Sequence, residues 1–163
     1  MSVAAWLPGP LASISPSFRV MCIEAGPRAD HPVYVSVGAS LLSRVPLEFV
    51  VAAPRCDPGY VELLAMVALY HHRRDLDFGH TLPIGHMPLS IAAPGHFLVS
   101  LPYPFGPDLE VCETQGGTTH LAWLLPVWRS EVLYRHANGT EALERLLDAR
   151  GVDYLDGQRQ AVV

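Results

Sequence analysis

Eight histidines in a chain of 163 residues make a metal centre the first chemistry to consider, because neutral imidazole is a common zinc ligand. His80 and His86 lie near Asp75 and Asp77 in the sequence, and these four residues are the best candidates. No H-E-x-x-H or H-x-H pattern places two ligands on one rigid element, however. We therefore predict no metal and no cofactor, and keep a metal-dependent enzyme with convergent His and Asp side chains as an alternative.

Two side chains could act as nucleophiles, Ser40 and Cys56. A serine hydrolase holds its serine on a sharp turn such as G-x-S-x-G, and Gly38-Ala39-Ser40 lacks the second glycine. Cys56 follows Arg55, but a catalytic cysteine also needs a base, and an inert thiol is the simpler interpretation. Nucleotide-binding glycine motifs are missing, and the phosphate-binding G-x-x-x-x-G-K-[ST] loop is excluded because lysine is absent. We predict no catalytic residue, with a small hydrolase as the alternative.

Acidic and aromatic side chains between residues 103 and 128 indicate contact with another protein. The formal net charge is −5 and all 11 basic residues are Arg, so no basic stripe for a nucleic acid is expected. The acidic run of Asp108, Glu110 and Glu113 either faces a basic partner or forms a solvated loop. Trp128 is either an exposed anchor or a buried core residue. The candidate partner-binding residues are Tyr103, Phe105, Asp108, Glu110, Glu113 and Trp128.

Composition predicts one domain in a reducing compartment. Half of the residues are hydrophobic and 17% are charged, which provides enough apolar material for one core at this length. The three cysteines are odd in number and far apart, which argues against a disulfide framework. Residues 1–16 lack the basic start of a signal peptide, and no apolar run reaches the roughly 18 residues of a membrane span. We expect a cytoplasmic protein without membrane contact.

Strands are predicted where β-branched and aromatic residues are bounded by Pro, Gly or Asp. In the first third of the chain these segments are Phe18 to Glu24, Val33 to Val37 and Leu47 to Ala52. We expect them to form an antiparallel meander. Thr119 to Leu125 is expected to be a central buried strand with Trp123 in the core. Residues 78–107 contain six prolines, which leaves room only for short extended pieces such as Phe97 to Leu101.

Helices are predicted in three places. Asp57-Pro58 is a good helix start, because Asp caps free N–H groups and Pro is tolerated at the first helical position. Apolar residues at i, i+3, i+4 and i+7 follow, and a basic cluster predicts an end near Arg73. Ser130 to His136 can form a short helix, and Asn138 to Glu141 has the pattern of a capping box for a last helix that ends at Gly151.

These elements predict an α+β fold with a mixed, mainly antiparallel sheet and helices packed on it, in a single compact domain. Residues 1–17 contain three prolines and are expected to form an irregular N-terminal lead-in. Residues 18–163 are expected to form the α+β domain.

The order of the segments resembles the suppressor-of-fused domain family over roughly residues 30 to 163. Val33 to Ser40 is similar to its early strand and glycine-containing turn, and Pro46 to Val51 to the next strand, which carries a glutamate. Thr119 to Val127 is similar to its apolar strand followed by a proline. The remaining matching positions are Glu131, Asn138, Gly139, Leu143, Leu146, Leu147 and the terminal D-x-x-R of Asp156 and Arg159. The chain resembles a bacterial member of this family.

The resemblance implies an α+β domain that has no known catalytic centre and binds another protein. Structural roles are expected for Gly38, Glu48, Trp123, Pro126, Glu131, Gly139, Asp156 and Arg159. We expect a terminal salt bridge between Asp156 and Arg159. We also expect Glu48 and Glu131 to pair with arginines at the sheet edge.

The sequence leaves three functions open. The first is a non-catalytic protein-binding domain, specifically an immunity-type protein that binds and neutralises a toxin domain in a bacterial polymorphic toxin system, as the resemblance implies. The second is the small hydrolase or metal-dependent enzyme. The third is a regulator that binds a peptide strand at an exposed sheet edge. The identity of the partner, the surface that binds it and the oligomeric state stay open.

Overall fold

The computed structural model describes residues 15–27, 29–85, 94–114 and 117–163. Most of the expected N-terminal lead-in, residues 1–14, lies outside this part of the chain, and so does His86. No helix within the described residues is long and apolar enough to cross a membrane.

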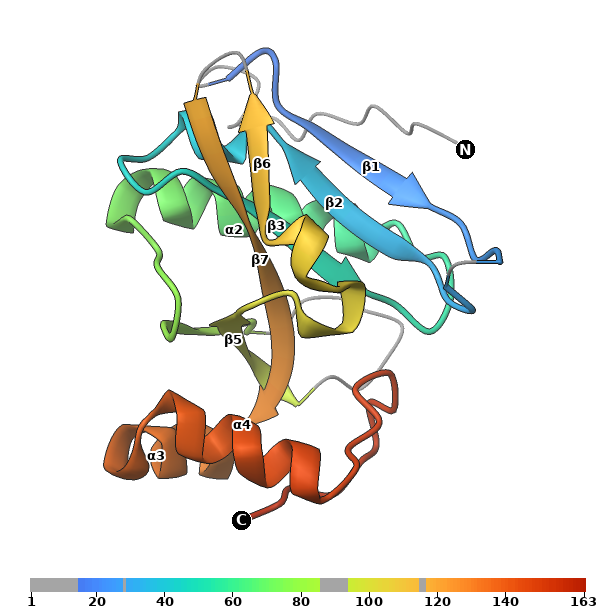
Figure 1. Cartoon of the computed structure of the whole chain (residues 1–163), viewed down its shortest axis with the longest axis vertical. Coiled ribbons are helices and arrows are strands. Elements are labelled where there is room, and N and C mark those ends of the chain that lie inside the picture. Colours follow the sequence, from blue (N-terminus) through green and yellow to red (C-terminus); the bar gives the residue numbers. More distant parts are fainter. Residues whose placement is uncertain (1–14, 28, 86–93, 115–116) are drawn as a thin grey trace.

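The described residues form one sheet with helices on both faces (Figure 1). The strands are β1 (Arg19–Ile23), β2 (Val33–Val37), β3 (Leu47–Ala52), β4 (Thr81–Pro83), β5 (Gly95–Ser100), β6 (Val111–Thr114) and β7 (Gly117–Trp128). The α-helices are α2 (Gly59–Arg74), α3 (Arg129–Asn138) and α4 (Thr140–Ala149). Short 3-10 turns are η1 (Ala39–Leu41), η2 (Tyr103–Phe105) and η3 (Pro107–Leu109).

The strand order is β1-β2-β3-β7-β5-β4, and β6 pairs with β7. The first three strands form the predicted antiparallel meander. Among the described pairings only β3 with β7 is parallel, so the predicted mixed and mainly antiparallel sheet of an α+β fold is confirmed. β7 is central, since β3 and β6 pair with its first half and β5 with its second half.

Pro126 lies inside β7, which continues to Trp128 instead of breaking at the proline. β5 pairs along this part of β7, whereas β3 pairs only as far as Trp123. The edge of β7 opposite β5 is therefore open at Pro126, and a residue without an N–H group is tolerated on such an edge. On that edge the Pro126 carbonyl accepts a hydrogen bond from the Arg159 guanidinium at 3.0 Å.

Alternating side chains along β3 and β7 divide the core between the two faces of the sheet. Phe49, Val51 and Leu124 belong to the cluster that also contains the buried side of α2. Val50 and Trp123, their sequence neighbours, belong to a second cluster shared with α3 and α4. Figure 1 shows α2 behind the upper part of the sheet, while α3 and α4 lie at the lower end of β7. This second cluster borders the surface described below.

The start of α2 agrees with the prediction from the sequence, whereas the start of α4 differs from it. The Asp57 carboxylate accepts a hydrogen bond from the Gly59 N–H at 2.8 Å, as expected for the start of α2. The capping box expected before α4 is wrong. Asn138 belongs to α3 and its side chain donates to the Tyr134 carbonyl at 2.9 Å, while Gly139, at φ +91°, joins the two helices without a side-chain cap.

Candidate protein-interaction surface

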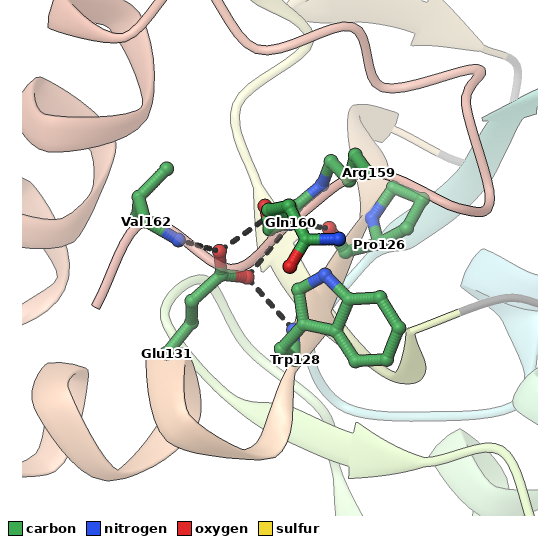
Figure 2. A network of polar contacts seen from close by, with 6 residues as sticks. All are labelled: Pro126, Trp128, Glu131, Arg159, Gln160 and Val162. Atoms are coloured by element: carbon green, nitrogen blue, oxygen red, sulfur yellow. Dashed lines mark hydrogen bonds and ion pairs between the residues drawn. The ribbon is translucent and has the colours of Figure 1, made fainter.

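Glu131 and Arg159 form a buried ion pair that ties the C-terminal segment to the first turn of α3 (Figure 2). Glu131 is fully buried, and the two terminal nitrogens of Arg159 donate to its two carboxylate oxygens at 2.7 Å each. The backbone N–H groups of Trp128 and Val162 donate to the same carboxylate at 2.7 and 3.1 Å. This network satisfies both oxygens, so its role is structural.

The expected salt bridge between Asp156 and Arg159 is therefore wrong. Arg159 pairs with Glu131 instead. The expectation that Glu131 has an arginine partner is therefore confirmed. The Asp156 carboxylate instead accepts a hydrogen bond from the Gln158 N–H at 2.8 Å, in a local turn.

Glu48 binds a turn and has no arginine partner in the described part of the chain, contrary to expectation. Its carboxylate accepts hydrogen bonds from the hydroxyls of Ser36 and Ser40 at 2.5 and 2.8 Å. The N–H groups of Gly38, Ala39 and Ser40 donate to it at 2.8 to 3.1 Å. Gly38 has φ +96°, a conformation that favours glycine. Glu48 thus holds the turn after β2 and also occupies the hydroxyl of Ser40, the serine considered above as a nucleophile.

The other residues considered for chemistry are spread over the fold. His80 Nδ1 accepts a hydrogen bond from the Asp77 N–H at 3.1 Å, while the Asp75 carboxylate accepts one from the Ser43 hydroxyl at 2.6 Å. Within the residues that the structure describes, no group of three His, Cys, Asp or Glu side chains is arranged to hold a metal ion. Cys56 is an exposed free thiol.

Five of the six candidate partner-binding residues lie on one segment, residues 103–114, which we call the acidic arm. It contains η2, η3 and β6 and runs along β7 (yellow in Figure 1). Tyr103 is 56% exposed, whereas Phe105 packs against the second core cluster. Asp108 and Glu113 are exposed and Glu110 is half-buried. The arm therefore presents carboxylates and one aromatic ring to solvent.

Trp128 is not brought together with the acidic arm. It is the last residue of β7, at the end opposite to the part that pairs with β6. It is half-buried, and its indole Nε1 is buried without a hydrogen-bond partner among the described residues. Trp128 is therefore not a fully exposed aromatic anchor.

A pocket of about 260 Å³ opens beside Tyr103. It lies between η2, the strands β5 and β7, helix α4 and the C-terminal segment. The described residues that line it are Ser100, Tyr103, Pro104, Trp123, Leu125, Glu144, Asp148 and Tyr154. The rings of Trp123 and Tyr154 meet edge to face, with centroids 4.9 Å apart and an interplanar angle of 87°. None of these lining residues is basic.

Glu144 and Asp148 make this pocket negative. They are one turn apart on α4, so both side chains reach the same side of the helix. Burial, followed by repulsion from Asp148 and Glu141, raises the pKa of Glu144, although the Ser100 hydroxyl donates to it at 2.5 Å. Sequence reasoning missed both residues, because it used only the leucine stripe of this helix. Their i, i+4 spacing was the available signal.

The carboxylates around the pocket also raise the pKa values of its two tyrosines. Burial raises the pKa of Tyr103, and Glu144 and Glu110 raise it further. Burial also raises the pKa of Tyr154 to about 12, and Asp148 adds to this shift. Glu110 belongs to the acidic arm and Glu144 to the pocket, so carboxylates of both the arm and the pocket act on Tyr103.

Comparisons with known proteins bear on both the fold and the family. The suppressor of fused protein family model matches residues 15–160. A crystal structure of a suppressor of fused homolog from Neisseria gonorrhoeae FA 1090 is 31% identical with a TM-score of 0.86, over 99% of this chain and 87% of that chain. No curated protein sequence matches the chain.

Two more distant structures share the fold. The Sufu-Fu complex matches with a TM-score of 0.65 and 14% identity, over 89% of this chain and 76% of that chain. Drosophila Suppressor of Fused matches with a TM-score of 0.65 and 15% identity, over 89% of this chain and 42% of that chain. The family match over nearly the whole chain, together with the Neisseria structure, shows that this protein belongs to the suppressor of fused family.

Proposed function

We propose that this chain is a non-catalytic, cytoplasmic protein-binding domain, an immunity-type protein that binds and neutralises a toxin domain of a bacterial polymorphic toxin system. A protein of the same fold is found in the Sufu-Fu complex, which supports protein binding as the activity of the domain. The net charge of −5 suits a basic partner.

The observation that carries the proposal is the exposed acidic arm. Its edge strand β6 is exposed along its whole length. The apolar side chains of Leu109 and Val111 are 43% and 45% exposed and lie among the carboxylates of Asp108, Glu110 and Glu113. Exposed apolar side chains next to charges of one sign are typical of a protein interface, where charge accelerates association and apolar contact slows dissociation.

The test begins with capture of partners by the tagged chain from its native host, at low and high salt, with mass spectrometry. We expect one stoichiometric protein that is released at high salt, because salt screens exposed charges. This protein, expressed alone, should arrest growth, and co-expression of the present chain should restore it.

Two matched variants locate the interface. Asp108→Asn, Glu110→Gln and Glu113→Gln together remove three charges from the acidic arm. Glu24→Gln, Asp30→Asn and Glu62→Gln remove three exposed charges outside it. Only the first variant should lose the partner and the protection. Equal behaviour of the two variants, or a captured protein that does not affect growth, would contradict the proposal.

Strand addition is the second candidate function. Among the described strands, β1, β4 and β6 each pair with one neighbour only, so each leaves an open edge. An open edge can accept a strand from a partner. These edge strands have five, three and four residues, so each offers only a short stretch of backbone to a partner strand.

A further inference from the structure

The pocket beside Tyr103 combines apolar walls with negative charge. Its apolar part consists of Tyr103, Pro104, Trp123, Leu125 and Tyr154. The faces of aromatic rings carry negative electrostatic potential and attract cations. The carboxylates of Glu144 and Asp148 lie on the same pocket.

The negative charge of the pocket is not compensated by the described residues. The ion pairs found among them involve Asp30, Glu131 and Glu141, and neither Glu144 nor Asp148 takes part in one. The donor to Glu144 is the neutral Ser100 hydroxyl. A half-buried carboxylate beside other carboxylates is stabilised when a cation approaches it.

We propose that this pocket binds the side chain of an arginine presented by the partner protein, with the guanidinium held by the aromatic rings and the carboxylates of Glu144 and Asp148. This inference rests on the proposed function, since the arginine belongs to the protein that the chain neutralises. A planar guanidinium is weakly hydrated, stacks on rings and donates to two carboxylates, so it suits these walls better than an ammonium group.

The size and position of the pocket agree with this occupant. Its volume of about 260 Å³ is that of a small cleft. Pockets for drug-sized molecules usually measure about 300–1,000 Å³, so a single side chain is the better fit. Tyr103 is both the first residue of the acidic arm and a wall of the pocket. A partner that covers the arm therefore reaches the pocket with the same face.

The probe is N-acetyl-arginine amide, titrated into the ¹⁵N-labelled protein and followed through the indole N–H of Trp123 by NMR. We expect a saturable shift with a Kd in the millimolar range, as for one side chain without the rest of an interface. N-acetyl-citrulline amide has nearly the same shape without the charge, and it should give no saturable shift. Equal shifts with both compounds, or no shift with either, would overturn the proposal.

Variants link the shift to the pocket. Glu144→Gln should raise the Kd of the arginine amide about tenfold, which corresponds to loss of one charge-assisted hydrogen bond. Tyr103→Leu should also raise this Kd, and the exposed position of Tyr103 tolerates the change without loss of the fold. Glu62→Gln removes one exposed charge from α2 and should leave the Kd unchanged. Unchanged binding in Glu144→Gln would contradict the proposal.

The pocket and the proposed function can fail separately. If the captured partner binds Glu144→Gln as tightly as the unaltered protein, the arginine pocket is wrong and the binding function stands. If the arginine amide binds but no toxin-like partner is captured, the toxin-neutralising function is wrong and the pocket stands.

Discussion

Glu131 and Glu144 are both glutamates on the C-terminal helices, yet their surroundings differ in charge. Glu131 is fully buried and faces the Arg159 guanidinium and two backbone N–H groups. Glu144 is half-buried and faces one hydroxyl and two other carboxylates. The fold neutralises the deeper charge internally, because an unpaired buried charge costs several kcal/mol. The shallower charge remains available for a partner.

The largest effect is expected from breaking the buried pair. Arg159→Met leaves the Glu131 carboxylate buried without its cation, and should lower the free energy of unfolding by about 3–5 kcal/mol. Urea unfolding followed by circular dichroism measures this change. Arg145→Met is the matched control, since it breaks an exposed pair with Glu141 at 3.8 Å and should cost less than about 1 kcal/mol. Similar losses of unfolding free energy in the two variants would show that burial of the Glu131–Arg159 pair adds nothing to its contribution to stability.

A second, smaller effect is expected at Glu48, which resembles Glu131 in being satisfied by several donors. Glu48→Gln replaces one acceptor oxygen by an NH₂ group and leaves N–H groups of the turn without an acceptor. We expect a loss of about 1–3 kcal/mol. Hydrogen exchange at the amides of residues 38–40 should become faster than in Glu24→Gln, which changes an exposed residue. Unchanged exchange would mean that Glu48 does not hold this turn.

His71 differs from Glu131 in being a buried group that has no counter-charge in contact. His71 is fully buried, its Nε2–H donates to the Val45 carbonyl at 2.9 Å, and it packs edge to face on Phe49. Burial lowers its pKa, although the Val45 bond and the more distant Asp75 oppose this shift.

Because the folded pKa of His71 is below the unfolded value of 6.5, the unfolded state binds its proton first as the pH falls. The free energy of unfolding should therefore decrease below about pH 6.5, by at most about 1.4 kcal/mol per pH unit. Urea unfolding at pH 7.5 and 5.5 measures this loss of unfolding free energy. The difference between the two pH values should be smaller in His71→Gln. An NMR titration in which the His71 ring protonates at or above pH 6.5 would contradict this expectation.

The smallest effect on stability is expected at Glu144. The raised pKa means that ionisation of Glu144 destabilises the folded state as the pH rises from about 4.5 through the folded pKa. Glu144→Gln removes this ionisation, so stability at pH 7 should stay within about 0.5 kcal/mol or increase slightly. Urea unfolding at pH 7 checks it. A loss above about 1 kcal/mol would show that Glu144 supports the fold as Glu131 does, which would weaken its assignment to binding.

Local patterns in the sequence were sufficient for most elements of the fold. Val33 to Val37 and Leu47 to Ala52 form strands with the predicted bounds, because β-branched residues between turn residues favour extended backbone wherever the chain folds. The capping box before α4 failed, because Asn138 hydrogen-bonds within α3. Because α3 continues through Asn138, the side chain of Asn138 is not available to cap α4.

By itself the sequence determined most of the helices and strands, the family and the acidic character of residues 103–114, since these depend on neighbours along the chain; the edge strand β6 was not predicted. Only the tertiary structure decided which carboxylates have partners. Arg159 reaches Glu131 across 28 residues, and the pocket joins residues from Ser100 to Tyr154. Asp156 is nearer to Arg159 in sequence, and its carbonyl accepts a hydrogen bond from the Arg159 N–H at 3.2 Å, but its carboxylate binds the Gln158 N–H and not the guanidinium. Charge pairing depends on distance in space and on burial, and both arise only when the strands and helices pack.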